Sequence, residues 1–261
     1  MRHKTDAYTD IGVKKQTNQD ALIIKKAQIR KNISVCMACI CDGMGGLSCG
    51  EIASSAYIYR MDEWFKNELP EIFSRTDYTE QLDGEKKSQS VYIRQVARSW
   101  NDLIQEMNSK LMEYGRKHNL QLGTTVVAIL IVNDEYIAMN VGDSRAYLIN
   151  GKKVDLITHD HSYVQQQIDS GNMTAEEARI SDKKSLLLQC VGASEVVTPE
   201  FYFGKCKKND IFLLASDGFW RRLDLCEMAK LVTKKEGLKE LTELAKERGE
   251  TDNISSLFVL V

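Results

Sequence analysis

Short apolar segments recur along this chain, and the turn sequences "NDE" and "NGK" directly follow two of them. Each segment has the length and composition of a β-strand. The predicted strands are Ala7–Val13, Asp20–Lys26, Ile33–Cys41, Thr125–Val132, Glu135–Asn140, Ser144–Ile149, Ile211–Ala215 and Ile254–Val261. Because strands that are joined by short turns pair antiparallel, we expect antiparallel sheets and not a parallel, doubly wound sheet.

Two long helices are predicted between these strands, at Ser48–Leu69 and Ser90–His118. In the second, apolar residues recur at three- and four-residue steps, as in a helix that buries one face. Shorter helical segments are predicted at Ser162–Gln189, Leu223–Thr233 and Leu238–Arg248. "SGNMT" interrupts the first of these, and Thr174 there caps a helix together with Glu177. Hairpins with grouped helices indicate the α+β class.

The size and charge of the chain exclude several classes of protein. It has 261 residues, with 35 basic against 37 acidic side chains and a net charge of −2. A nucleic-acid partner is therefore not expected, since such proteins carry a strongly basic face. The longest apolar runs, Val35–Cys41 and Val126–Val132, are far shorter than the roughly 20 residues of a membrane span. The N-terminal sequence MRHKTDAYTD lacks the apolar segment of a secretory signal.

We therefore expect a cytoplasmic protein without a membrane partner, and we take it to be a monomer. The polar link Ser74–Ser90 is predicted to be a surface loop, so that residues 1–261 form a single domain. Three cysteines, Cys36, Cys39 and Cys41, crowd one predicted strand, where side chains alternate between faces and suit a disulfide framework poorly. A zinc site through Cys36 and Cys39 lacks a second ligand pair. Reduced cysteines in the core are expected.

Aspartates stand at the ends of five predicted strands. They are Asp20, Asp42, Asp143, Asp217 and Asp252. Any one of them alone is more commonly a turn residue. Carboxylates that converge at strand ends would repel one another unless a cation neutralised them. Oxygen ligands without a histidine or cysteine set favour Mg²⁺ or Mn²⁺, so the joint pattern predicts a metal site.

The segment "CDGMGG", Cys41–Gly46, lies where an apolar strand meets a helical pattern. Asp42 is predicted to be a metal ligand, and glycine at position 43 would let the backbone bend until its carbonyl also reaches metal. Gly45 and Gly46 would then turn the chain tightly into the following helix.

Seven motifs stand in the order found in metal-dependent protein phosphatases of type 2C. They are "NQDA" (Asn18–Ala21), "CDGMGG" (Cys41–Gly46), "GTT" (Gly123–Thr125), "VGDSRAYLI" (Val141–Ile149), "DHS" (Asp160–Ser162), "ASDGFW" (Ala215–Trp220) and "TDNIS" (Thr251–Ser255). The chain resembles the compact bacterial members of that family from about Tyr8 to Val261. The resemblance implies a sandwich of two antiparallel sheets with helices on both outer faces, a four-layer αββα arrangement.

The resemblance also implies roles for the aspartates. Asp42 would bridge two metal ions, the Gly43 carbonyl would bind one of them, and Asp217 and Asp252 would be further ligands. Asp143 matches an aspartate that bacterial relatives use for a third, looser ion, with Asp217 shared. Asp20 would either bind metal directly or accept a hydrogen bond from metal-bound water. The catalytic residues implied are Asp20, Asp42, Asp217 and Asp252.

The implied reaction is hydrolysis of phosphoserine or phosphothreonine on proteins. Two Mn²⁺ or Mg²⁺ ions would lower the pKa of a bridging water and aim it in line at phosphorus. Whether a third, looser ion also binds stays open at this point. Phosphorylated proteins would be the partners, together with a serine/threonine protein kinase that the enzyme opposes in bacterial signalling.

The chain departs from the family at several positions. Lys15 stands where relatives carry an arginine that grips the substrate phosphate, and an ammonium is a single point charge instead of a two-pronged fork. Gln19 replaces a glutamate of some relatives, and Met44 is interpreted as a packing residue. Arg221 and Arg222 follow "SDGFW", where many relatives are acidic, and are interpreted as a solvated, basic helix start.

Residues 161–189 include His161–Ala178, which resembles the family's flap, a helical excursion that influences substrate choice. His159 and His161 are interpreted as structural and not as metal ligands. Two alternatives to a protein phosphatase stay open. One is a pseudophosphatase, a module that binds phosphoproteins without turnover, and the other is a metal-dependent hydrolase of small phosphoesters.

Overall fold

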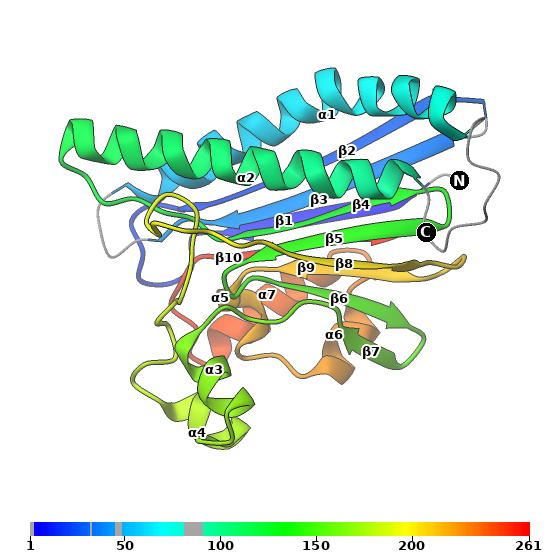
Figure 1. Cartoon of the computed structure of the whole chain (residues 1–261). Helices are drawn as coiled ribbons and strands as arrows, with labels where there is room; N and C mark the ends of the chain where they lie inside the picture. The colour runs from blue at the N-terminus through cyan, green and yellow to red at the C-terminus, as the bar shows by residue number, and fades with distance from the viewer. Residues whose placement is uncertain (1–2, 32, 45–48, 81–90) are drawn as a thin grey trace.

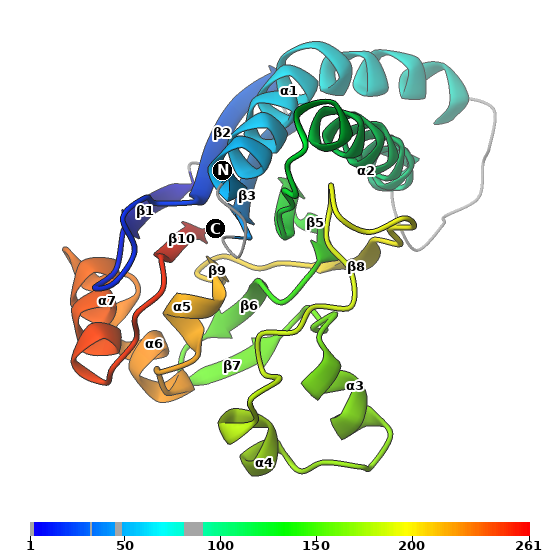
Figure 2. The same ribbon diagram turned by 90° about the vertical axis from the view of Figure 1, so that its left-hand side faces the viewer.

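The computed structural model of this chain describes residues 3–31, 33–44, 49–80 and 91–261. Two sheets of five strands each pack face to face, and helices cover both outer faces (Figure 1). Helices α1 (Gly50–Glu80) and α2 (Val91–His118) lie over one sheet, and α5 (Asp217–Trp220), α6 (Leu225–Leu231) and α7 (Gly237–Glu247) lie over the other (Figure 2). The predicted α+β, four-layer sandwich is confirmed.

The order of strands brings distant parts of the sequence together. One sheet runs β2 (Asp20–Arg30), β3 (Ile33–Asp42), β4 (Val126–Val132), β5 (Glu135–Val141) and β8 (Glu200–Lys205). The other runs β1 (Lys4–Asp10), β10 (Ile254–Leu260), β9 (Ile211–Ala215), β6 (Arg145–Asn150) and β7 (Lys153–Leu156). Every pairing in both sheets is antiparallel.

Successive side chains of β3 point to opposite faces of the sheet and so belong to two different core layers. Cys36 and Ile40 point into the core between the sheets, whereas Cys39 and Cys41 point toward α1 and α2. Cys36 and Cys39 therefore cannot share a zinc ion. All of the cysteines are free thiols, and burial raises the pKa of Cys36 to about 12, in keeping with the predicted reduced core.

The first long helix differs from its prediction, because α1 continues through Pro70 to Glu80. Proline removes one helical hydrogen bond and clashes with the preceding turn. Packing offsets this cost, since Ile72 and Phe73 beyond the proline are buried against the sheet. The predicted surface loop Ser74–Ser90 is accordingly wrong in its first part, and residues 81–90 lie outside the described residues.

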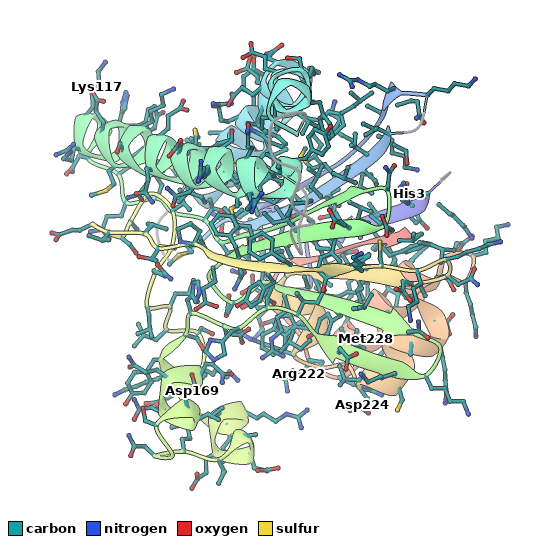
Figure 3. All side chains as sticks on the ribbon, turned by 45° about the vertical axis from the view of Figure 1, so that its right-hand side comes forward. His3, Lys117, Asp169, Arg222, Asp224 and Met228 are labelled. Atoms are coloured by element: carbon teal, nitrogen blue, oxygen red, sulfur yellow. The ribbon has the colours of Figure 1, made fainter. Side chains whose placement is uncertain are left out.

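An excursion leaves the sandwich after β7 and carries two short helices, α3 (Tyr163–Asp169) and α4 (Ala175–Ile180). The Thr174 and Glu177 capping box at α4 is confirmed. The predicted helical segment is wrong beyond Ile180, where turns replace helix as far as Gln189. Asp169 lies on this excursion, which projects away from the sheets (Figure 3).

None of the helices in the described ranges combines the length and hydrophobicity that a bilayer span requires.

Candidate metal centre

The five strand-end aspartates converge at one end of the sandwich. Asp20 opens β2 directly opposite Asp42 at the end of β3, and Asp252 stands just before β10. Asp217 is the first residue of α5 after β9, and Asp143 lies in the turn between β5 and β6. Loss of hydration raises the pKa of Asp42 well above its ordinary value, and the charges of the other four aspartates raise it further. The other four aspartates are therefore close enough for their charges to act on Asp42.

The backbone of Asp42 is held by the neighbouring strand. Its carbonyl accepts hydrogen bonds from the Thr125 backbone N–H at 2.9 Å and from the Thr124 hydroxyl at 3.0 Å. Its own N–H donates to the Thr125 hydroxyl at 3.1 Å. The "GTT" motif thus fixes the position of the central carboxylate.

Gly43 fits a space that no other residue could occupy. A Cβ at this position would lie 2.4 Å from the Gly50 carbonyl oxygen and 2.5 Å from that of Gln19, far inside contact distance. The Gly43 N–H donates to the same Gln19 oxygen at 3.1 Å. The structure thus shows a steric need for glycine at position 43, the predicted approach of its carbonyl to metal stays a prediction, and Gly45 and Gly46 lie outside the described residues.

Asn253 positions the loop between β1 and β2, and the sequence interpretation missed it. Its side-chain amide donates to the carbonyls of Ile11 and Thr17 at 2.9 and 3.1 Å, and its oxygen accepts from the Gln19 N–H at 2.9 Å. The "TDNIS" motif carried a signal, because an amide beside a strand-end aspartate is a common bridge between loops. Asn253 brings Lys15 to the site.

Lys15 lies at the edge of the site, beside Asp252. Its Nζ atom is 2.7 Å from Asp252 Oδ1, and about a third of the Lys15 side chain is exposed. Loss of hydration alone would lower the pKa of Lys15, but the contact with Asp252 and the nearby charges of Asp42 and Asp217 raise it. Lys15 is therefore a cation that neutralises one of the candidate ligands.

Arg221 corrects one expectation from the sequence. Its side chain is only 16% exposed, and its guanidinium contacts Asp217 Oδ2 at 2.8 Å and Asp143 Oδ2 at 3.1 Å. Arg222, by contrast, is exposed, with its nearest carboxylate oxygen, on Glu250, at 3.7 Å. The predicted helix start is wrong for both, because α5 ends at Trp220 and Arg221 is its C-cap. The predicted solvation is right for Arg222 and wrong for Arg221, because Arg221 follows Asp217 by one helical turn and the two face the same way.

Asp20 is the least satisfied of the carboxylates. Both of its oxygens are buried, and neither makes a hydrogen bond of normal geometry within the described part of the chain. Loss of hydration raises its pKa to about 7, although the Ser255 and Ser216 hydroxyls lie near enough to oppose the rise. Loss of hydration likewise raises the pKa of Asp143 to about 7.

The residues present fit hard divalent cations. Carboxylate oxygens, a glycine cradle at Gly43 and the unpartnered oxygens of Asp20 are a donor set for Mg²⁺ or Mn²⁺. Across the described residues no three His, Cys, Asp or Glu side chains are already grouped around one position. Lys15 and Arg221 hold three of the carboxylates instead, so metal binding requires some of these ion pairs to open.

The two histidines that follow β7 contact protein groups. His161 Nδ1 accepts from the Gly142 N–H at 3.2 Å and lies 2.7 Å from the Gln189 amide nitrogen. His159 contacts Asp169 of α3 at 2.9 Å. The Gln19 side-chain amide donates to Glu51 Oε2 at 3.0 Å.

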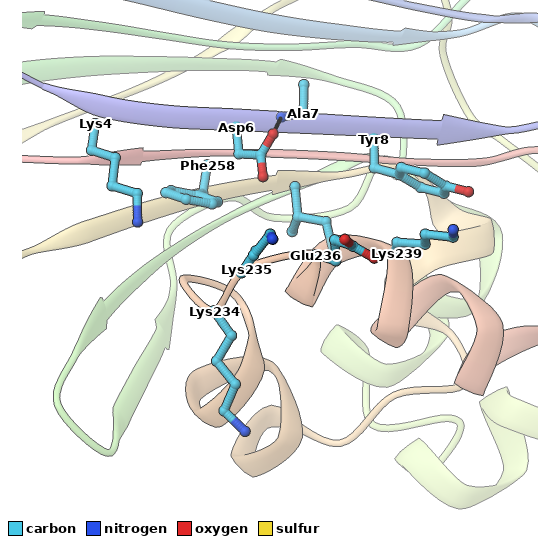
Figure 4. Close-up of a pocket in the computed structure, with 10 residues that line it drawn as sticks. Lys4, Asp6, Ala7, Tyr8, Lys234, Lys235, Glu236, Lys239 and Phe258 are labelled. Carbon is cyan, nitrogen blue, oxygen red and sulfur yellow. Dashed lines mark hydrogen bonds between the residues drawn. The ribbon is translucent and has the colours of Figure 1, made fainter.

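A separate hollow of about 450 Å³ lies between β1 and α7 (Figure 4). Lysines dominate its rim, and none of the five aspartates lines it. It is not part of the candidate metal centre.

Comparison with known proteins shows the family to which the chain is related. The sequence matches the family model described as "Protein phosphatase 2C" over residues 12–253. A putative protein phosphatase 2C-type of Streptococcus pyogenes is 30% identical over 98% of this chain and 96% of its own. The serine/threonine phosphatase stp of Listeria innocua is 27% identical over 84% of this chain and 82% of its own.

Solved structures share the fold. The serine/threonine phosphatase of S. agalactiae has a TM-score of 0.79 at 27% identity, with all of both chains covered. The catalytic domain of the phosphatase PstP, crystallised with 2 manganese ions, has a TM-score of 0.74 at 24% identity, with 99% of this chain and 97% of its own covered.

Proposed function

Since this chain belongs to the protein phosphatase 2C family and is a metal-dependent protein serine/threonine phosphatase, we propose that its strand-end aspartates form the catalytic metal centre. The observation that carries this proposal is the convergence of the five carboxylates at one end of the sandwich, where loss of hydration and then the charges of the other four raise the pKa of Asp42. Carboxylates in such a cluster are stable as anions only when cations neutralise them.

The proposed ligands of two Mn²⁺ or Mg²⁺ ions are Asp42, the Gly43 carbonyl, Asp217 and Asp252. The bound ions supply positive charge that acidifies a water molecule and neutralises phosphoryl oxygens. Asp42 is suited to the shared position because its backbone is fixed by Thr124 and Thr125. Asp20, whose two oxygens have no hydrogen-bond partner among the described residues, either binds an ion directly or accepts a hydrogen bond from a water molecule at the site.

Lys15 is proposed to bind the substrate phosphate. The Lys15 ammonium is held by Asp252 in this structure. When Asp252 binds an ion, Lys15 loses this partner and becomes available to donate to a phosphoryl oxygen. Its partial exposure supports this proposal, because the ammonium is accessible from the protein surface.

Phosphorylated proteins and a serine/threonine kinase are proposed as the partners in bacterial signalling. We further propose a cytoplasmic, monomeric protein in which the whole chain forms one domain. Support comes from the balanced charge, which offers no footprint for nucleic acid, and from relatives named as serine/threonine phosphatases. The pseudophosphatase alternative finds no support, because all five aspartates are present and the charges of the other four act on Asp42.

The test is the substitution Asp217→Asn, which removes one negative charge from the ligand set and keeps the side-chain shape. We expect Mn²⁺ affinity and turnover of a phosphothreonine peptide to fall at least about 100-fold, the upper range for a residue that merely supports a ligand. The matched control is Asp155→Asn on β7, where the carboxylate is exposed and contacts Lys153. A folded Asp217→Asn protein with full Mn²⁺-dependent activity would refute the assignment.

A further inference from the structure

Arg221 forms a bridge between two of the five aspartates. One guanidinium nitrogen, Nη1, lies 2.8 Å from Asp217 Oδ2, and the other, Nη2, donates to Asp143 Oδ2 at 3.1 Å. The exposed fractions of the three side chains are 16% for Arg221, 13% for Asp217 and 6% for Asp143. A charge so poorly hydrated stays in place only when it is paired, as each of these is.

The surrounding residues fix the guanidinium in this position. Nη1 also donates to the Ser185 hydroxyl at 3.2 Å, and Nη2 to the Lys184 carbonyl at 3.3 Å. The Trp220 ring lies 5.7 Å from the guanidinium carbon of Arg221, and its own N–H donates to the Asp143 carbonyl at 3.0 Å. Four acceptors from three segments therefore hold Arg221.

Trp220 is held in turn by a contact with Arg145. The guanidinium carbon of Arg145 lies 3.4 Å from the centre of the Trp220 ring, a cation–π contact. Arg145 is fixed in turn by Asp160, with donor–acceptor distances of 2.9 and 2.8 Å. Because each member is anchored by the next, Arg221 has little freedom to leave its two carboxylates.

The occupied atoms have a consequence for metal binding. An ion placed between Asp143 and Asp217 would compete with Arg221 for these two carboxylates, each of which already has one oxygen engaged by the guanidinium, and it would stand against a fixed positive charge. We propose that Arg221 takes the place of a third divalent ion at this pair, so that the centre holds two ions and Asp143 binds none. The inference rests on the proposed two-ion centre.

The experiment counts ions instead of measuring turnover. Mn²⁺ bound per chain is determined by equilibrium dialysis with elemental analysis, up to millimolar Mn²⁺, with circular dichroism as the check of folding. The native chain is expected to bind two ions. Arg221→Ala and Arg221→Gln are each expected to gain one, and the glutamine keeps a donor for Ser185 or Lys184 if the alanine variant folds poorly.

Three further variants give the assignment. Arg222→Ala removes the same charge one residue away and is expected to stay at two ions. Arg221→Ala combined with Asp143→Asn is expected to return from three ions to two, which places the gained ion at Asp143. In the otherwise native chain, Asp143→Asn alone is expected to leave the count at two.

Three results would overturn the inference. They are a native chain that binds three ions, a native count that falls by one in Asp143→Asn, and folded Arg221 variants that stay at two. A native chain that binds no Mn²⁺ at all would refute the proposed metal centre itself.

Discussion

Replacement of Lys15 tests how the site holds phosphate. Lys15→Ala removes an ammonium that can make one charge-assisted hydrogen bond to a phosphoryl oxygen, a contact worth about 1.5–3 kcal/mol. Because the Lys15 ammonium is partly exposed and makes only one such contact, we expect the loss of binding free energy to lie at the lower end of that range. The Michaelis constant for a phosphothreonine peptide should therefore rise about tenfold, since about 1.4 kcal/mol is one power of ten.

Lys15→Arg should shift the Michaelis constant in the opposite direction from Lys15→Ala. A guanidinium offers two parallel donors to phosphate, so we expect the Michaelis constant to fall. The maximal rate should change much less than in Asp217→Asn, because in the proposed site Lys15 contacts the substrate whereas Asp217 is a ligand of the ions. The assay is steady-state kinetics at saturating Mn²⁺, with Lys14→Ala as the control that removes the same charge from an exposed neighbour.

A Mn²⁺ titration distinguishes the proposed phosphate-binding role of Lys15 from a purely structural role. Lys15 contacts Asp252, so its loss removes both a competitor for the carboxylate and a repelling charge. The dissociation constant for Mn²⁺ should therefore fall in Lys15→Ala. Thermal stability should hardly change, since an ion pair this exposed contributes only about 0–1 kcal/mol. Unchanged Michaelis constants in both variants, or weaker Mn²⁺ binding in Lys15→Ala, would contradict the proposed role.

Three further predictions address the cradle, the flap and the outer helices. Gly43→Ala, whose Cβ would overlap the Gly50 carbonyl, should lower both the melting temperature and Mn²⁺ affinity, and a normal melting curve with normal Mn²⁺ binding would exclude the steric argument. Deletion of Gly171–Ala178 should change discrimination among phosphopeptides more than hydrolysis of a small aryl phosphate, and equal losses on both would indicate a structural segment. Contact with Arg248 lowers the pKa of Glu227 from 4.5 to about 2, so the stability it contributes is present above pH 4.5 and is lost as pH falls toward 2. The difference in unfolding free energy between the native chain and Glu227→Gln, measured by urea denaturation, should therefore shrink over that range, and a constant difference would contradict it.

Strands were predictable from the sequence where both of their faces are buried. Ile211–Ala215 was predicted with the bounds observed, because five successive apolar residues lie between the two cores. The strands β7 and β8 were missed. Each stands at the edge of its sheet and mixes exposed with partly buried residues, so no apolar run marks it.

The convergence of the aspartates could also be predicted, for a topological reason. Asp42, Asp217 and Asp252 each adjoin a strand that is buried throughout its length, and these strand ends meet at one end of the sandwich. Their positions follow from the backbone alone. Their individual roles as ligands stay a prediction, because they depend on side-chain rotation that neither periodicity nor spacing determines.

The cations of the site were harder to predict than its anions. Lys15 reaches Asp252 only because Asn253, far along the chain, holds the loop that carries it. Arg221 reaches Asp143 across 78 positions of sequence, and only the four-residue spacing to Asp217 hinted at its direction. Long, flexible side chains are placed by contacts that form after folding, so a charged pair such as Arg221 and Arg222 looks alike in the sequence while one is enclosed and the other exposed.

These two cations change the electrostatic balance at which the site works. Five carboxylates against the charges of Lys15 and Arg221 leave three negative charges when all are ionised. Two divalent ions more than offset that excess and leave the centre weakly positive, which suits a phosphate dianion. Replacing the fixed charge of Arg221 by a third divalent ion would add one more positive charge and would strengthen the hold on the phosphate product. In the proposed two-ion centre, a cation built into the chain gives the carboxylates a permanent partner and adds less positive charge than a third divalent ion would, and we expect this balance to favour release of phosphate after hydrolysis.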